Sequence, residues 1–295
     1  MDRMTRSGFI ALAGRPNVGK STLANAIVGA KVAIVSDKPQ TTRRAVRGVA
    51  TGEGWQLVLV DLPGVQRPRD ALTTRMQRRV ERELEDADAC LFVVDGEQGI
   101  GPGDRFIARL LGAAPVPVVV AVNKVDRARH GGTVAALQAA SDLGVSRHLF
   151  PVSARTGAGV AALVEHLVSL LPAGPFYFSP EQHSDQPQPL LLAELVREQV
   201  LRRTREEVPH AVEVEVQEIQ RVEELVRIGA VLLVETESQK GILIGAGGRT
   251  IKSIGSAARR AIERELGVHV HLELSVSVRR HWRADERLLD RLGID

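Results

Sequence analysis

The sequence predicts a doubly wound α/β domain with a mostly parallel sheet, followed by a smaller α+β domain. The 295-residue chain is about twice the length of a typical domain. Residues 1–172 alternate short apolar runs with helical patterns, which is typical of a parallel sheet covered by helices. Beyond a proline-rich stretch, strands and helices no longer alternate one to one, and this change indicates a second domain.

Five apolar segments of the first region are rich in Val, Leu and Ile, as expected of strands buried on both faces of a sheet. The predicted strands are 9–13, 56–60, 89–94, 116–122 and 148–152. Helical patterns lie between them, and we predict helices at 20–28, 73–85 and 133–143. Ligands of open α/β folds bind outside the carboxyl ends of the strands, so we expect the site at that edge.

The stretch from Pro172 to Leu190 holds 5 of the 14 prolines, so it can be neither a regular helix nor a central strand. The elements expected after it are a helix at 190–207, strands at 211–219 and 230–235, helices at 238–244 and 249–266, a strand at 268–278 and a helix at 284–292. We therefore place a first domain at 1–172, a linker at 173–190 and a second domain at 191–295.

Composition excludes several classes of protein. No apolar run reaches the ~20 residues that span a bilayer, and a single cysteine, Cys90, excludes an internal disulfide and a cysteine-based zinc site. We expect a cytoplasmic protein. Residues 1–172 carry 22 basic against 16 acidic side chains, and the rest carries 17 against 20. Attraction for nucleic acid must therefore come from local patches.

Residues 14–21 read GRPNVGKS, which fits the pattern G-x-x-x-x-G-K-[ST] between a predicted strand and a helix. Glycines allow such a loop to wrap a phosphate with backbone N–H groups, and the helix N-terminus adds partial positive charge. Lys20 is expected to reach the β- and γ-phosphates, and the Ser21 hydroxyl to ligate Mg²⁺. The motif predicts a nucleoside triphosphate site.

Two further motifs follow predicted strands. Asp61 opens the sequence DLPG, where its carboxylate would hold Mg²⁺ and the Gly64 N–H would contact the γ-phosphate. Residues 123–126 read NKVD and use one of only three asparagines and one of six lysines. A buried Asp126 carboxylate can accept from N1–H and the exocyclic amine of guanine, whereas adenine has no donor at N1. The motifs therefore favour GTP over ATP.

The remaining contacts of the base are expected from Lys124, whose alkyl stem can cover it, and from Ala154, whose N–H can donate to guanine O6. Ser153 and Ala154 count only through their position after the last strand of the first domain. The predicted nucleotide-binding residues are Gly14, Arg15, Pro16, Asn17, Val18, Gly19, Lys20, Ser21, Thr22, Asp61, Leu62, Pro63, Gly64, Asn123, Lys124, Asp126, Ser153 and Ala154.

The order and spacing of these motifs resemble the translation-factor-related GTPases, and GRPNVGKS with QTTR at 40–43 resembles their TrmE–Era branch. The resemblance implies that Thr42 is a Mg²⁺ ligand. Val65 stands where Ras-like enzymes carry a water-orienting glutamine. In the TrmE–Era branch a loop asparagine coordinates K⁺, which implies this role for Asn17; the alternative is that Asn17 only hydrogen-bonds the loop. Catalytic roles are expected of Lys20, Thr42 and Asn17.

Residues 243–255 read LIGAGGRTIKSIG and resemble the core of a type II KH domain, an RNA-binding module whose G-x-x-G loop approaches the sugar-phosphate chain. Six basic residues and one acid lie between Lys240 and Arg264. The variable pair, Ala246-Gly247, lacks the basic residue often found there, so Arg249 and Lys252 are expected to compensate. The predicted RNA-binding residues are Lys240, Gly245, Ala246, Gly247, Gly248, Arg249, Lys252 and Arg259; the arginine-rich stretch 67–82 is the alternative.

A GTPase domain followed by a type II KH domain resembles those TrmE–Era members that act in ribosome assembly. This implies a monomeric GTP/GDP-binding enzyme that uses Mg²⁺ and K⁺ and acts in 16S rRNA processing and biogenesis of the small (30S) subunit. The implied partner is the 3′ region of 16S rRNA, and no binding to DNA is expected. The resemblance also implies that the protein associates peripherally with the inner face of the cell membrane. An RNA-binding assembly protein with incidental hydrolysis stays open because Val65 offers no general base.

Overall fold

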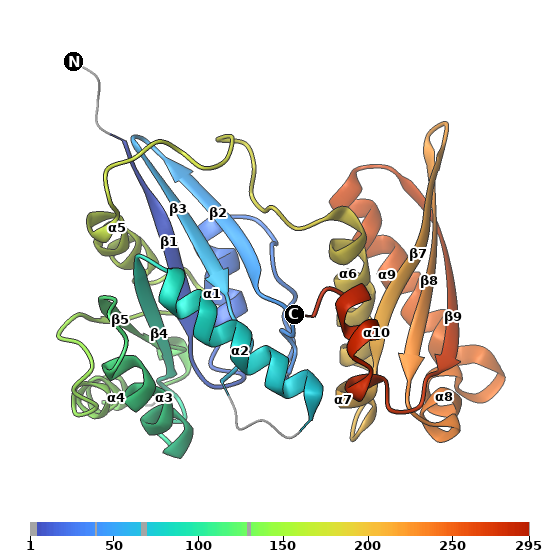
Figure 1. Ribbon diagram of the computed structural model, residues 1–295, viewed down its shortest axis with the longest axis horizontal. Coiled ribbons are helices and arrows are strands. Elements are labelled where there is room, and N and C mark those ends of the chain that lie inside the picture. Colours follow the sequence, from blue (N-terminus) through green and yellow to red (C-terminus); the bar gives the residue numbers. More distant parts are fainter. Residues whose placement is uncertain (1–4, 39, 66–69, 129–130, 295) are drawn as a thin grey trace. The chain divides into compact units, whose positions relative to one another are not determined.

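The structure is a computed structural model that describes residues 5–38, 40–65, 70–128 and 131–294. The chain folds into two compact units (Figure 1). The first is built from most of the chain up to Asp185. The second begins at Gln186 and also takes in two short earlier segments, Ser36–Thr41 and Asp70–Leu72.

The first unit is a six-stranded sheet in the order β2-β3-β1-β4-β5-β6. Only the pair of β2 and β3 is antiparallel; the other pairs are parallel. The elements are β1 (Arg6–Ala13), α1 (Lys20–Val28), β2 (Val46–Gly52), β3 (Trp55–Asp61), α2 (Ala71–Asp86), β4 (Ala89–Asp95), α3 (Pro102–Gly112), β5 (Val118–Asn123), the 3₁₀ turn η1 (Val125–Arg127), α4 (Gly132–Ser141), β6 (Leu149–Pro151) and α5 (Val160–Leu170).

Helices cover both faces of this sheet, and each face has its own hydrophobic core. On one face α1 and α5 pack through side chains such as Leu23 and Leu163. On the other, α2, α3 and α4 pack through side chains such as Leu84 and Ile107. Because alternate residues of each strand point to opposite cores, β4 is buried along its whole length.

Residues 173–185, most of the predicted linker, are bound along the first unit; we call this segment the strap. Its ends form isolated bridges, Arg6 with Ala173 and Gly48 with Ser184. Between them the fully buried Gln56 accepts from the N–H groups of Tyr177 and Phe178 at 2.8 and 3.0 Å and donates to the Phe178 carbonyl at 2.9 Å. Only residues 186 and 187 therefore lie between the strap and the next helix, which begins at Gln188, although the predicted linker ran over residues 173–190.

The second unit is a three-stranded sheet in the order β7-β8-β9, antiparallel and then parallel, with α6 and α9 packed on one core. Trp282 is buried, and its Nε1 donates to the Ala211 carbonyl at 2.7 Å. The elements are α6 (Gln188–Arg203), α7 (Val208–Ala211), β7 (Glu213–Val222), β8 (Leu225–Val234), α8 (Glu237–Ile244), η2 (Ala246–Gly248), α9 (Arg249–Leu266), β9 (His269–Val278), η3 (Trp282–Ala284) and α10 (Glu286–Arg291).

The predicted fold class is confirmed, with differences at several ends. The helices expected at 20–28 and 249–266 have the predicted bounds. The helix expected at 190–207 ends at Arg203, and the strand expected at 230–235 begins already at Leu225, directly after the hairpin turn. The strand β2 was not among those predicted, because its sequence, VRGVATG, contains two glycines and lacks a continuous apolar run.

Candidate functional site

The four predicted nucleotide motifs meet at the carboxyl edge of the first sheet. The loop 14–19 joins β1 to α1, Asp61 ends β3, Asn123 ends β5, and Ser153 follows β6. These strands are neighbours or near neighbours in the sheet, so motifs more than 100 residues apart in sequence converge on one place. The side chains of Val18 and Leu62 are buried in the cores, which leaves only their backbones for a nucleotide.

The loop before α1 is shaped for close backbone approach. Gly19 caps α1 in a left-handed conformation, with φ 97°, and a Cβ there would collide with the Asn123 amide. Asn17 is also left-handed, with φ 65°. Gly64 lies against this loop, since a Cβ on it would come within 2.9 Å of the Pro16 nitrogen. Residues 61–64 thus lie over the phosphate-binding loop as the motif requires.

Lys20 is held inside this loop. Its Nζ donates to the carbonyls of Gly14 and Arg15 at 3.0 and 3.3 Å, and the residue is buried. Burial lowers the pKa of Lys20 to about 8, against the opposing attraction of Asp61. Phosphate oxygens would replace the lost solvation of this ammonium group, which favours anion binding at this point.

Three oxygen-bearing side chains form a cluster beside Lys20. Ser21 Oγ donates to Asp61 Oδ2 at 2.6 Å and shares a hydrogen bond with Thr42 Oγ1 at 3.1 Å. Thr42 Oγ1 also lies 3.4 Å from the same Asp61 oxygen, and its one hydroxyl hydrogen can go either to that oxygen or to Ser21 Oγ. Burial raises the pKa of Asp61, opposed by Lys20 and the two hydroxyls. The predicted Mg²⁺ residues are therefore together.

A test of metal fit comes from the other oxygen of Asp61. Its Oδ1 is buried and has no hydrogen-bond partner. Hard oxygen donors and an unpartnered carboxylate oxygen suit Mg²⁺, which proteins often hold with one carboxylate plus substrate phosphates. Within the described residues no group of three or more His, Cys, Asp or Glu side chains could hold a metal.

The predicted base-recognition residues also converge. Asn123 Nδ2 donates to the Val18 carbonyl at 2.9 Å, and its Oδ1 accepts from the Ala154 N–H at 3.0 Å. Lys124 Nζ donates to the Asn17 carbonyl at 2.7 Å. Asp126 Oδ1 accepts from Ser153 Oγ at 2.7 Å. Asn123 and Lys124 therefore tie the phosphate loop to the loops expected to hold the base.

Two expectations need correction. The Asp126 side chain is 17% exposed, so its carboxylate is partly open to solvent rather than fully buried. The Ala154 N–H donates to Asn123, so guanine O6 would have to share that donor. The hydroxyl of Ser153 has a part that the motif did not predict, because it orients Asp126. Val65 is buried in the core and cannot orient a water.

The basic surface of the second unit is built around Gly245. Its φ of 70° and ψ of 170° suit glycine, and a Cβ would come within 3.0 Å of the Thr250 nitrogen. Ala246 and Gly247 are exposed at the tip. Arg249, Lys252 and Arg259 are exposed on α9, whose opposite face is buried, and Arg249 Nε donates back to the Ala246 carbonyl at 3.2 Å.

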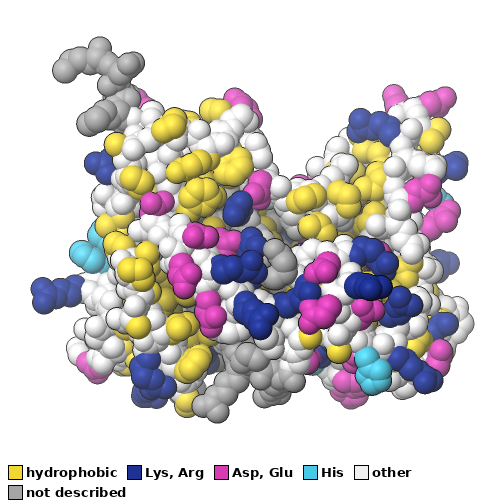
Figure 2. All heavy atoms as spheres, in the orientation of Figure 1, with side chains coloured by type: hydrophobic (Ala, Val, Ile, Leu, Met, Phe, Trp, Pro, Cys, Tyr) yellow, Lys and Arg dark blue, Asp and Glu magenta, His cyan; other side chains and the backbone are white. Residues whose placement is uncertain are grey.

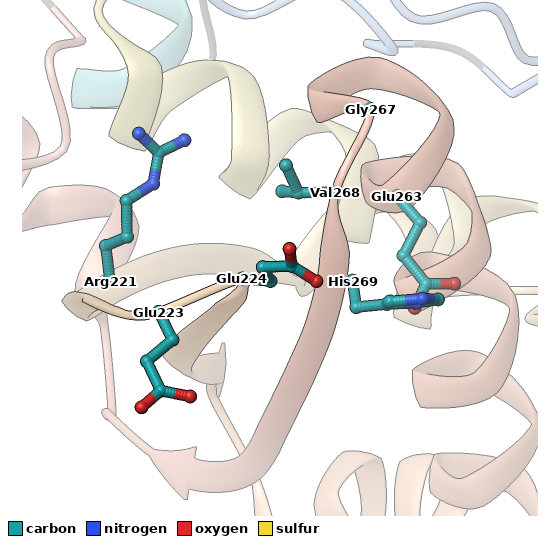
Figure 3. A pocket seen from close by; sticks show the side chains of 7 residues that line it. All are labelled: Arg221, Glu223, Glu224, Glu263, Gly267, Val268 and His269. Atoms are coloured by element: carbon teal, nitrogen blue, oxygen red, sulfur yellow. The ribbon is translucent and has the colours of Figure 1, made fainter.

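The far end of α9 lies beside a hollow of mixed charge. The hollow is lined by the hairpin turn of β7 and β8 and by the start of β9, with Glu223, Glu224 and Glu263 around it together with Arg221 and His269 (Figure 3). Figure 2 shows basic and acidic side chains interspersed on one face of the molecule. Of the alternative stretch 67–82, residues 67–69 lie outside the described residues.

Comparison with known proteins bears directly on this pair of sites. A family model described as a 50S ribosome-binding GTPase matches residues 9–124, and a KH domain model matches residues 207–283. GTPase Era of Alkaliphilus oremlandii is 42% identical over 292 residues, which cover 98% of this chain and 99% of that protein. The chain belongs to the Era GTPase family. GTPase Era of Mycobacterium tuberculosis is 44% identical over 294 residues, covering 97% and 98%.

Solved Era structures match the whole fold. A variant of Aquifex aeolicus Era bound to GDP.AlF4⁻ aligns with a TM-score of 0.92 at 34% identity, covering 98% of this chain and 99% of that one. Era in complex with MgGDPNP and nucleotides 1506–1542 of 16S ribosomal RNA aligns with a TM-score of 0.94 at 35% identity and the same coverage. The family makes this chain a GTP-hydrolysing enzyme with a KH domain.

Among the described residues no helix is long and apolar enough to cross a membrane.

Proposed function

We propose that this Era-family GTPase binds the 3′ region of 16S rRNA through its KH domain and acts in maturation of the small ribosomal subunit. The observation that carries this is the pairing, in one chain, of a converged GTP site with an exposed basic G-x-x-G surface. A relative of the same fold, aligned over 98% of this chain, was solved with 16S rRNA nucleotides 1506–1542. The cytoplasmic location, the monomeric state and the membrane association stay predictions.

Mg²⁺ is the metal that we assign to Ser21, Thr42 and Asp61, the residues that form the oxygen cluster. When bound, it would neutralise charge on the β- and γ-phosphates during hydrolysis. Lys20, between the carbonyls of Gly14 and Arg15, stabilises the same negative charge from within the loop. Hydrogen bonds within the site hold Lys20, Ser21 and Asp61 in place, and electrostatic stabilisation lowers a barrier most when the stabilising groups are already fixed.

K⁺ is assigned to Asn17. This residue is exposed at the turn of the phosphate loop, and its backbone carbonyl is fixed by Lys124. A monovalent cation at this point would add positive charge beside the transferred phosphoryl group. The assignment is supported by the exposed position of Asn17 in the loop that would hold the phosphates, where a cation could reach both the loop and a phosphate oxygen.

The RNA assignment is tested by competition binding at defined salt. We expect an RNA of the 16S 3′ region to outcompete an unrelated single strand of equal length. Replacing Ala246→Asp together with Gly247→Asp puts two negative charges beside the phosphates and should abolish RNA binding, while GTP binding is retained. Lys252→Ala should weaken binding less and lower the log–log salt dependence by about 0.7, the contribution of one single-strand phosphate contact.

The matched control replaces the same two positions without charge, as Ala246→Ser with Gly247→Asn. Asparagine tolerates the left-handed backbone of residue 247, so this variant should bind RNA within a few-fold of the parent. Parental RNA binding by the double Asp variant would remove this loop from the RNA site. The exposed arginines of α2, such as Arg78 and Arg82, would then be the next surface to test.

A further inference from the structure

The segment between β4 and α3 contacts the phosphate-binding loop at both of its ends. It runs from Asp95, the last residue of β4, to Asp104 in the first turn of α3. Both residues are buried, with 1% and 0% exposed. A buried carboxylate is costly unless a cation pairs with it. Here both cations, Arg15 and Lys124, come from the nucleotide motifs.

The contact of Asp104 is with Arg15. Arg15 Nε donates to Asp104 Oδ1 at 3.1 Å and lies 2.9 Å from Oδ2. Its Nη1 donates to Gln98 Oε1 at 3.2 Å, and its Nη2 to the Gly99 carbonyl at 3.1 Å. All three guanidinium nitrogens thus bind residues 98–104, so this side chain is directed to that segment. Its own carbonyl is one of the two that hold Lys20.

The contact of Asp95 is with Lys124. Lys124 Nζ donates to Asp95 Oδ2 at 2.6 Å and, from the same ammonium group, to the Asn17 carbonyl at 2.7 Å. The second oxygen, Asp95 Oδ1, accepts from the N–H groups of Glu97 and Gln98 at 2.9 and 3.0 Å. The carboxylate therefore fixes both the lysine and the turn that leads towards Gln98.

We propose that Asp95 and Asp104 are positioning residues of the guanine-nucleotide site. Together they hold Arg15 and Asn17, on either side of Pro16, and so keep the phosphate loop in its binding shape. Binding to a loop already in shape costs less ordering entropy, so these two carboxylates raise nucleotide affinity without touching the nucleotide. The inference rests on the nucleotide site proposed above and is independent of the RNA assignment.

The test is the rate of GDP release from Asp95→Asn, Asp104→Asn and Arg15→Ala, measured with a fluorescent GDP. Each should release GDP about tenfold faster than the parent. Asparagine keeps the shape, and its side-chain oxygen can still accept from the Gly101 N–H that Asp104 now binds at 2.8 Å. The double variant Asp104→Asn/Arg15→Ala should be no faster than its faster single variant, because both changes remove the same contact.

The matched control is Asp185→Asn. Asp185 forms an ion pair at 3.3 Å with Arg47, a residue of the edge strand β2, and the substitution removes this carboxylate. This variant should release GDP at the parental rate. GDP release within twofold of the parent in all three single variants would overturn the proposal, even if their melting temperatures fall. Additive rates in the double variant would overturn the coupling of Asp104 through Arg15. If one single variant fails to fold, the GDP release rates of the other two still test the proposal.

A second control separates this proposal from the site on which it rests. Lys20→Ala should abolish tight GDP binding. If Lys20→Ala binds GDP as the parent does, the nucleotide site itself is misplaced. If Lys20→Ala loses GDP while Asp95→Asn and Asp104→Asn release it at the parental rate, only the positioning role is wrong.

Discussion

The three asparagines of the chain show how much of the first unit depends on single side chains. Asn123 joins the phosphate loop to the loop after β6 through two hydrogen bonds. Asn25 accepts from the N–H groups of Val32 and Ala33, both at 2.9 Å, and fixes the chain after α1. Asn17 stands at the exposed turn of the phosphate loop. In a chain that rarely uses asparagine, each one has a definable contact or position.

Asp126 carries the discrimination of the base. Asp126→Asn should weaken GTP binding by at least tenfold and improve binding of xanthosine triphosphate, because xanthine presents a carbonyl where guanine presents an amine. Ser153 Oγ, which now donates to Asp126, can donate equally to the amide oxygen, so the side chain should stay in place. Competition between the two nucleotides measures the effect. An equal loss for both would contradict the assignment.

Asn17 is assigned to the monovalent cation. GTP hydrolysis by the parent should be faster in K⁺ than in Na⁺ at equal ionic strength, since Na⁺ is too small for the same oxygen cage. Asn17→Ala should lose this preference and still bind nucleotide, because the Lys124 contact uses the backbone carbonyl of residue 17. Hydrolysis rates in the two salts provide the measurement. Equal parental rates in both would remove Asn17 from the mechanism.

The residues that were predicted from the sequence belong to short motifs, whereas a residue that was missed pairs with a partner far along the chain. Lys20, Ser21, Asp61 and Asn123 were predicted because each stands at a fixed spacing next to a strand end. Asp104 was missed because its partner Arg15 is 89 residues away, and spacing within a motif says nothing about such pairs. Asp95 directly follows the predicted strand 89–94 at the ligand-binding edge, so its position was a signal that could have been used.

At the scale of elements, strands of continuous apolar residues were predictable, and edge features were not. The parallel strands β1, β3, β4 and β5 are buried on both faces and reveal themselves by composition. The edge strand β2 does not, because it contains two glycines and no continuous apolar run. Its contact with the strap, where the His183 carbonyl accepts from the Val49 N–H at 2.8 Å, joins residues far apart in the sequence. Prolines correctly indicated that the strap is irregular but could not indicate where it is bound.

The strap depends on Gln56. Gln56→Ala should lower the free energy of unfolding by about 2 kcal/mol, because the N–H groups of Tyr177 and Phe178 and the Phe178 carbonyl lose their partner together. Urea unfolding measures the change. Gln77→Ala, which removes an exposed hydrogen bond with Glu81 on α2, is the matched control and should stay within about 0.5 kcal/mol of the parent. A parental stability for Gln56→Ala would mean that water replaces the amide without loss.

At the scale of the whole molecule, the chain combines an enzyme that lacks a polar residue at position 65 with a domain that binds RNA in its family. The alternative of incidental hydrolysis predicts two independent halves. Coupling predicts instead that RNA changes the hydrolysis rate and that the bound nucleotide changes RNA affinity. For the two binding equilibria, the change must be reciprocal: GTP must affect RNA affinity by the factor by which RNA affects GTP affinity.

Single-turnover hydrolysis with and without saturating 16S 3′ RNA decides between these alternatives. We expect the RNA to raise the rate at least fivefold and to bind with different affinity to the GTP-analogue and GDP forms, since a ligand shifts a conformational equilibrium only through differential affinity. The Ala246→Asp/Gly247→Asp variant should hydrolyse GTP at the parental rate without RNA and show no increase with it. An equal rate with and without RNA, together with equal RNA affinity in both nucleotide states, would show that the GTPase site and the KH surface of this chain work independently.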